Sequence, residues 1–288
     1  MKQNEEDIYK IDVNKAWDTV FSRLEEDRLL TEETDSSFYR KRKIPLKWMA
    51  VAAAVVAGIF FSISYFPKNK DSSSLVFLQN KDNSTTLVKT LEDGSTVYLA
   101  GNASITYPAV FAKNKRKVEM SGNVLFCVTK DKKRPFVVKT IENITIEVVG
   151  TIFAVQSAIE NPFELSVKQG RVNVHSDDYQ TVVPVDAGET LQMGSNELIK
   201  SGTDNFGVFS CFTEKMRFKD EKLNNIIQAI NSMYGFPAII IDESLSNRTL
   251  TVTFENESVE TMTELICVAL NLERVNNQDT ILIRQFLK

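Results

Sequence analysis

The pattern of apolar and polar positions changes three times along the 288 residues, and it predicts four parts. Residues 1–39 are polar apart from one helical stripe, and residues 48–66 are mostly apolar and carry no charge. Residues 76–175 alternate with a period of two, and the residues after 212 mix both kinds of pattern. A period of two is typical of half-buried strands, and a period of 3.6 is typical of amphipathic helices. The predicted fold class is therefore mainly β, with a smaller α+β part at the end.

The alternating part consists of short segments rich in β-branched and aromatic residues, set off by turn residues. These segments are 76–78, 86–88, 96–99, 104–107, 117–120, 124–129, 136–140, 144–149, 152–156, 164–167 and 171–175. Many strands at this spacing without an intervening helix predict an all-β sandwich or barrel-like domain. We expect this domain to end near Gly202.

The last part, from Phe212 onward, has alternating helices and strands. KMRF and AIIID predict strands around the helix LNNIIQAINSMYG, whose apolar stripe is closed by Gly235. TLTVTF and TILIRQ predict strands on either side of a second helix. That helix carries Val259, Met262, Leu265, Ile266, Ala269 and Leu270. The order β-α-β-β-α-β predicts a small α+β domain whose two helices cover one face of its sheet.

The continuous apolar run predicts a membrane helix over residues 44–66. Trp48 to Phe66 is free of charge, and at a rise of about 1.5 Å per residue it extends about 28 Å, close to the hydrocarbon thickness. Lys47 can snorkel at one end, and Trp48 and Tyr65 suit the two aromatic belts. A cleaved signal peptide fits less well, because a long acidic stretch precedes the run and no A-x-A site follows it. Basic residues cluster before the run, which places the N-terminus in the cytoplasm.

The N-terminal tail is acidic and contains one predicted helix. Residues 1–39 hold eleven acidic and five basic residues. Asp12 can cap a helix whose apolar face collects Val13, Trp17, Val20, Phe21 and Leu24. Such a helix either lies on the membrane surface or completes its fold in the groove of a cytoplasmic partner. Its acidic balance favours the partner, because the inner leaflet is itself negative.

Composition and motifs exclude several classes of function. A net charge of −4 argues against nucleic acid as the main partner. The three cysteines, Cys127, Cys211 and Cys267, are too scattered for a zinc site, and we expect them to be small buried side chains. A single disulfide bond between two of them is the alternative. His175 has no second histidine nearby and is expected at the surface. Without a phosphate loop, HExxH, CxxC or nucleophile elbow, we expect no cofactor, no metal and no ordinary enzyme.

The β part resembles the FecR family of transmembrane anti-sigma regulators. Residues 91–99, followed by Ser104, Tyr107 and Pro108, are similar to the opening hairpin of the family, with Asp93-Gly94 as its turn. The later blocks are Arg116, Val118, Gly122, Phe126 and Val128, then residues 135–138, residues 149–155, and Val167, Gly170, Val172, Val174 and residues 187–189. Asn123 and Ala154 depart from the family pattern. The last part is similar to the C-terminal domain common in iron- and polysaccharide-responsive members.

The resemblance implies an inner-membrane regulator with its N-terminus in the cytoplasm and its C-terminus in the periplasm. Such a protein holds an extracytoplasmic-function sigma factor by its tail and responds to the signalling domain of an outer-membrane TonB-dependent receptor. The implied parts are a sigma-binding tail (1–43), a transmembrane helix (44–66), a linker (67–75), a FecR-type β domain (76–205), a linker (206–211) and a C-terminal domain (212–288). The alternative is a membrane-anchored periplasmic adaptor or secretin-assembly protein.

The Gly150-Thr151 bond has two interpretations. In some members of the resembled family the matching bond breaks by itself, which prepares the protein for stepwise proteolysis by periplasmic and intramembrane proteases. Chemically, a threonine hydroxyl can attack the preceding carbonyl carbon, but it needs a nearby base to do so. The alternative is a tight corner between two strands, in which glycine only permits a bend.

Overall fold

The computed structural model divides into two compact units, residues 1–68 and residues 69–288. The residues that it describes are 18–19, 22–23, 74–159, 161–176, 181–194, 197–203, 207–277 and 279–286. In the first unit, Asp18, Thr19, Ser22 and Arg23 are helical and exposed, where the sequence predicts the tail helix. The predicted membrane helix over 44–66, with Lys47, Trp48, Tyr65 and Phe66, lies outside the described residues. Among those that are described, no helix is long and apolar enough to cross a membrane.

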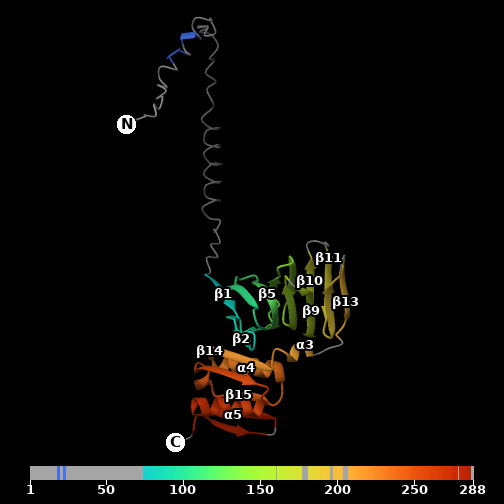
Figure 1. Ribbon diagram of the computed structural model, residues 1–288. Helices are drawn as coiled ribbons and strands as arrows, with labels where there is room; N and C mark the ends of the chain where they lie inside the picture. Colours follow the sequence, from blue (N-terminus) through green and yellow to red (C-terminus); the bar gives the residue numbers. More distant parts are fainter. Residues whose placement is uncertain are drawn as a thin grey trace, which may run out of the picture. The chain divides into compact units, whose positions relative to one another are not determined.

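The second unit begins with two β-sheets that share one long strand (Figure 1). Sheet A contains, in spatial order, β1 (Leu75–Gln79), β4 (Ser104–Pro108), β5 (Arg116–Cys127), β6 (Phe136–Lys139), β7 (Ile144–Val148), β10 (Arg171–Ser176) and β11 (Thr181–Asp186). Sheet B contains β16 (Thr249–Glu255), β14 (Lys215–Lys222), β2 (Thr86–Thr90), β3 (Thr96–Leu99), β5, β8 (Ile152–Ala158), β9 (Asn161–Gln169), β12 (Glu189–Met193) and β13 (Leu198–Gly202). Apolar side chains of both sheets form one core, which confirms the predicted all-β character.

Strand β5 passes from one sheet to the other at Gly122. Its first half pairs with β4 and β6, and its second half pairs with β3 and β8. Gly122 has φ +94°, and a Cβ there would lie 2.7 Å from the Cα of Ala103, so only glycine fits the crossing. The prediction of two strands, 117–120 and 124–129, with a turn between them was therefore wrong. Ser121 to Asn123 is a bend inside one strand.

The residues after 207 form α3 (Gly207–Ser210), α4 (Leu223–Tyr234), α5 (Val259–Leu270), the short 3-10 helix η1 (Glu243–Leu245) and two sets of strands. Strands β14 and β16 extend sheet B, and β14 runs parallel to β2. The remaining strands form sheet C, in the order β15 (Ala238–Ile241), β18 (Thr280–Arg284) and β17 (Glu273–Asn276). The expected single sheet of a separate domain is thus two sheets, and β17 adds a strand to the predicted order.

A second core joins this C-terminal part to the sandwich. Val88, Tyr98 and Leu125, on the outer face of sheet B, pack with Ile226 and Ile230 of α4. Figure 1 shows α4 nearest to the sandwich and α5 farther from it. Because sheet B is covered on both faces at this point, β3 is buried at every position.

Local signals at the helix ends agree with the structure. Helix α4 ends where predicted, with Gly235 at φ 73°. Helix α5 is capped by Ser258, whose side chain accepts a hydrogen bond from the Thr261 N–H. The predicted core stripe of α5 is only partly correct, because Leu265 is exposed while Ile266 is buried. Strands β11, β12 and β13 had not been predicted. Strand β11 contains Pro184, which an edge strand tolerates because one of its edges needs no ladder hydrogen bond.

Candidate functional site

The predicted sigma-binding face of the tail lies outside the described residues. This holds for Val13, Trp17, Val20, Phe21 and Leu24, whose roles remain predictions. The described neighbours Asp18, Thr19, Ser22 and Arg23 are exposed. In a helix, Ser22 points away from the predicted apolar stripe, since it lies five positions beyond Trp17 at about 100° per residue.

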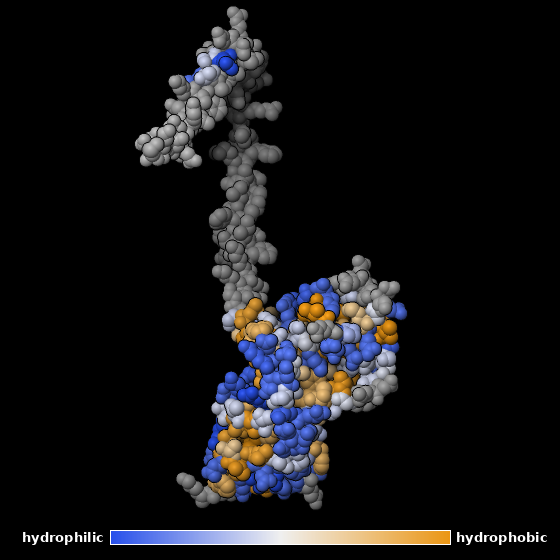
Figure 2. Space-filling model, in the orientation of Figure 1, coloured by the Kyte–Doolittle hydropathy of each residue, from blue (hydrophilic) through white to orange (hydrophobic). Residues whose placement is uncertain are grey.

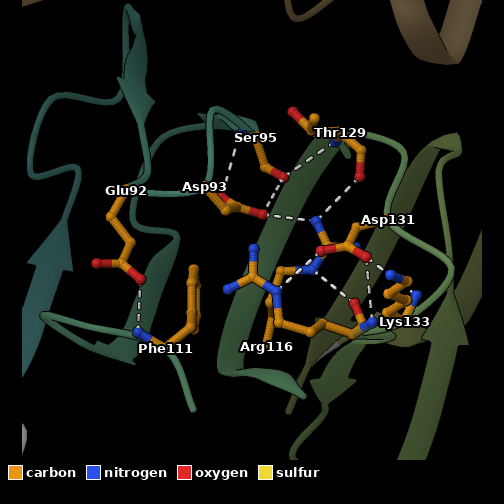
Figure 3. Close-up of polar contacts among 9 residues, drawn as sticks. Glu92, Asp93, Ser95, Phe111, Arg116, Thr129, Asp131 and Lys133 are labelled. Carbon is orange, nitrogen blue, oxygen red and sulfur yellow. Dashed lines mark hydrogen bonds and ion pairs between the residues drawn. The ribbon is translucent and has the colours of Figure 1, made fainter. Parts of the chain in front are cut away.

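A buried ion pair holds the turn between β2 and β3 against the start of β5 (Figure 3). The Arg116 Nη1 donates to Asp93 Oδ2 at 2.7 Å and to the Thr129 carbonyl at 2.9 Å. The Arg116 Nε donates to the Arg134 carbonyl, and the guanidinium lies 5.4 Å from the centroid of the Phe136 ring. Both charged side chains are almost fully buried, at 1% and 2% exposure.

The same cluster continues through Ser95. Its hydroxyl donates to Asp93 Oδ2 and accepts from the Thr129 N–H, so that the turn and both ends of β5 share one network (Figure 3). A buried charge that lost its partner would be costly, and the network therefore fixes this corner of the sandwich rather than supplying chemistry. The sequence identifies Asp93 as part of a turn and Arg116 as a point of family resemblance. Their direct contact is a finding of the structure.

The Gly150-Thr151 bond lies in the bend between β7 and β8. Gly150 has φ +156°, and a Cβ there would come within 2.8 Å of the Cα of Lys130. Thr151 is buried, and its hydroxyl donates to the Arg171 carbonyl at 3.1 Å. Among the described residues, no carboxylate or imidazole forms a hydrogen bond with this hydroxyl. The positive φ and the close approach of Lys130 explain why glycine occupies this bend, as the corner interpretation expects.

Polar contacts also link β2 and β3 to the C-terminal part. The buried Tyr98 hydroxyl on β3 donates to the Ala229 carbonyl of α4 at 3.0 Å. Lys89 on β2 forms an ion pair of 2.7 Å with Glu221 on β14, and that carboxylate is 3% exposed. These two contacts connect β2 and β3 directly to β14 and α4.

Free sheet edges and exposed apolar side chains are both found in the C-terminal part. Strands β15 and β17 are the edges of sheet C, and β16 is an edge of sheet B. Ile240 of β15, Val268 of α5 and Phe286 are exposed. A free edge offers unpaired backbone N–H and C=O groups to a strand of another protein.

The cysteines and the histidine lie apart from one another in the described part of the chain. None of the three cysteines is paired, and Cys127 and Cys267 are buried as predicted. Cys211 is exposed, contrary to expectation, because it follows the short helix α3 in a turn rather than in a strand. His175 is half-buried in β10. Across the described ranges, no group of three or more His, Cys, Asp or Glu side chains gathers as a metal site.

Comparisons with known proteins match two regions of the chain. Residues 82–173 match the family described as FecR protein, and residues 215–283 match the one described as FecR, C-terminal. Two crystal structures of a candidate anti-sigma factor from Parabacteroides distasonis are similar to this chain, each with 22% sequence identity and a TM-score of 0.46. Each match covers 74% of this chain and 100% of the other. No curated protein matches the chain.

Proposed function

Because the chain belongs to the FecR family of anti-sigma regulators, we propose that it is a single-pass inner-membrane anti-sigma factor. Its N-terminal tail holds an extracytoplasmic-function sigma factor in the cytoplasm, and its periplasmic part receives the signal. The observation that carries this proposal is the order of parts. An acidic tail and a 19-residue apolar run precede a FecR region and a FecR C-terminal region in one chain.

The tail is suited to a basic partner. Its eleven acidic residues against five basic ones give it a negative field, and sigma factors carry basic surfaces for DNA and polymerase. The apolar stripe supplies the contact that is buried on binding, with Trp17 as its largest side chain. Interface energy concentrates in such buried aromatic residues.

The signal comes from a TonB-dependent receptor of the outer membrane. Its signalling domain binds the C-terminal part by adding to a free edge of sheet C, and the sigma factor then controls iron or polysaccharide uptake genes. The coupling of Tyr98 to Ala229 and of Lys89 to Glu221 supports this route, because it connects the docking part to the strands that follow the membrane segment.

Substitution of Trp17 tests the tail. Trp17→Ala is expected to weaken sigma binding by at least about tenfold, since losing a buried aromatic anchor typically costs about 2 kcal/mol or more. Ser22→Ala, on the opposite side of the helix, is the matched control and should bind as the wild type does. Co-purification of residues 1–43 with candidate sigma factors gives the measurement. If no sigma factor binds the wild-type tail, the adaptor alternative is favoured.

The receptor contact needs point substitutions rather than truncation. Deleting residues 212–288 would uncover Val88, Tyr98 and Leu125 on sheet B, and loss of response could then reflect unfolding. Ile240→Lys places a charge on the exposed face of β15 and is expected to abolish induction while sigma binding persists. Val182→Lys makes the same change on the exposed edge strand β11 and should leave induction intact.

A further inference from the structure

An apolar patch lies on the outer face of strand β1, at the start of the second unit. Leu75, Phe77 and Val110, which together we name the β1 patch, are 72%, 64% and 63% exposed. Leu75 and Phe77 alternate along β1 and face the same side, and Leu75 and Val110 line one shallow groove. Figure 2 shows apolar atoms gathered over β1. Large side chains that are this exposed and adjacent commonly mark a contact surface.

Basic side chains border the β1 patch. Residues 109–118 contain four basic residues and no acidic one, in a chain whose net charge is −4. Arg116 is buried against Asp93, which leaves the exposed Lys113, Lys115 and Lys117. Lys115 and Lys117 line the same groove as Leu75 and Val110. Lys117 also pairs with Glu119 at 2.8 Å, so Lys113 and Lys115 provide most of the free charge.

The chain itself limits how far the β1 patch can lie from the predicted membrane helix. Eight residues separate Phe66 from Leu75, and the nine Cα–Cα steps between these two residues span about 30 Å when fully extended. A short tether of this kind gives an effective concentration in the millimolar range, at which even weak contacts are populated.

We propose that the β1 patch and its lysines dock the periplasmic part onto the outer leaflet of the inner membrane, through anionic phospholipid headgroups. This inference rests on the membrane anchor of the proposed function. Apolar side chains flanked by lysines match the boundary between acyl chains and anionic headgroups. A second copy fits less well, because an isologous contact would bring two sets of these lysines together. Docking fixes the sandwich relative to the membrane, so a displacement at α4 and β14 is transmitted instead of being lost in the linker.

The test uses the full chain in single-copy lipid nanodiscs that contain phosphatidylglycerol. In a Cys211→Ser background, Gln79→Cys places a fluorophore on the exposed face of β1, two residues beyond Phe77, and leaves the β1 patch intact. Asn173→Cys, on the same outer face of sheet A, is the matched control. It lies five strand spacings away, which is about 24 Å. Nitroxide-labelled lipids quench only fluorophores that lie close to the bilayer.

Stronger quenching is expected at residue 79 than at residue 173. Leu75→Ser with Phe77→Ser should reduce the quenching at residue 79 to the control level. Phosphatidylcholine alone should weaken the docking equilibrium about fivefold for each lysine that contacts headgroups. Equal quenching at the two positions, or quenching that survives the double substitution, overturns the docking inference. If the chain fails to co-elute with the discs, the anchor proposal fails, and the docking inference fails with it.

Discussion

The buried pair of Arg116 and Asp93 allows a quantitative test of how the sandwich is held together. Arg116→Met keeps the approximate volume but leaves the Asp93 carboxylate buried without a counter-charge. It also removes the donors to the Thr129 and Arg134 carbonyls. Breaking a buried ion pair from one side typically costs about 3–5 kcal/mol. Since whole domains are stable by only about 5–15 kcal/mol, this loss should be large and easily measured.

The measurement is guanidinium unfolding of residues 69–288 followed by far-ultraviolet circular dichroism, because both tryptophans lie before residue 69. Lys117→Met is the matched control on the same strand. It removes an exposed pair with Glu119 and should cost less than about 1 kcal/mol. Adding Asp93→Asn to Arg116→Met removes both charges and should recover part of the loss, because the two sites are in contact. A loss for Arg116→Met no larger than that of Lys117→Met would refute the argument.

Three further predictions concern the second unit. Gly122→Ala should lower the free energy of unfolding by about 1–3 kcal/mol or more, because φ is positive and a Cβ would meet the Ala103 backbone at 2.7 Å. Gly188→Ala is the matched control: φ is also positive there, at +83°, but nothing lies within 4 Å of the added Cβ, so it should cost less in the same unfolding assay. Burial raises the pKa of the Cys127 thiol to about 12, so this thiol stays protonated at pH 8. Mass spectrometry after alkylation at that pH should find the exposed Cys211 modified, while Cys127 reacts only on unfolding. An immunoblot should show an intact chain of 288 residues for wild type and for Thr151→Ala alike. Self-cleavage would instead be established by wild-type fragments of 150 and 138 residues that are missing in the variant.

The local signals of the sequence were reliable where one short segment decides the outcome. The short β-branched and aromatic segments 96–99 and 144–149 predicted β3 and β7, and the stripe ending at Gly235 predicted α4. The Asp93-Gly94 turn also formed as expected, with Gly94 at φ 81°. Each of these depends on the preferences of neighbouring residues, which the sequence contains directly.

Only the tertiary structure decided which segments meet. Strand β14 pairs with β2 although the whole β-sandwich lies between them in sequence, and no period or turn residue encodes that choice. Packing of the C-terminal part on sheet B buries Tyr98 and Cys127, and residues 69–288, which were expected to form two domains, make one compact unit. The candidate site followed the same division. Its motif residues could be recognised in the sequence. The contact of Arg116 with Asp93, however, depends on how distant strands pack. A buried charge is tolerated only where the fold brings an oppositely charged partner within reach.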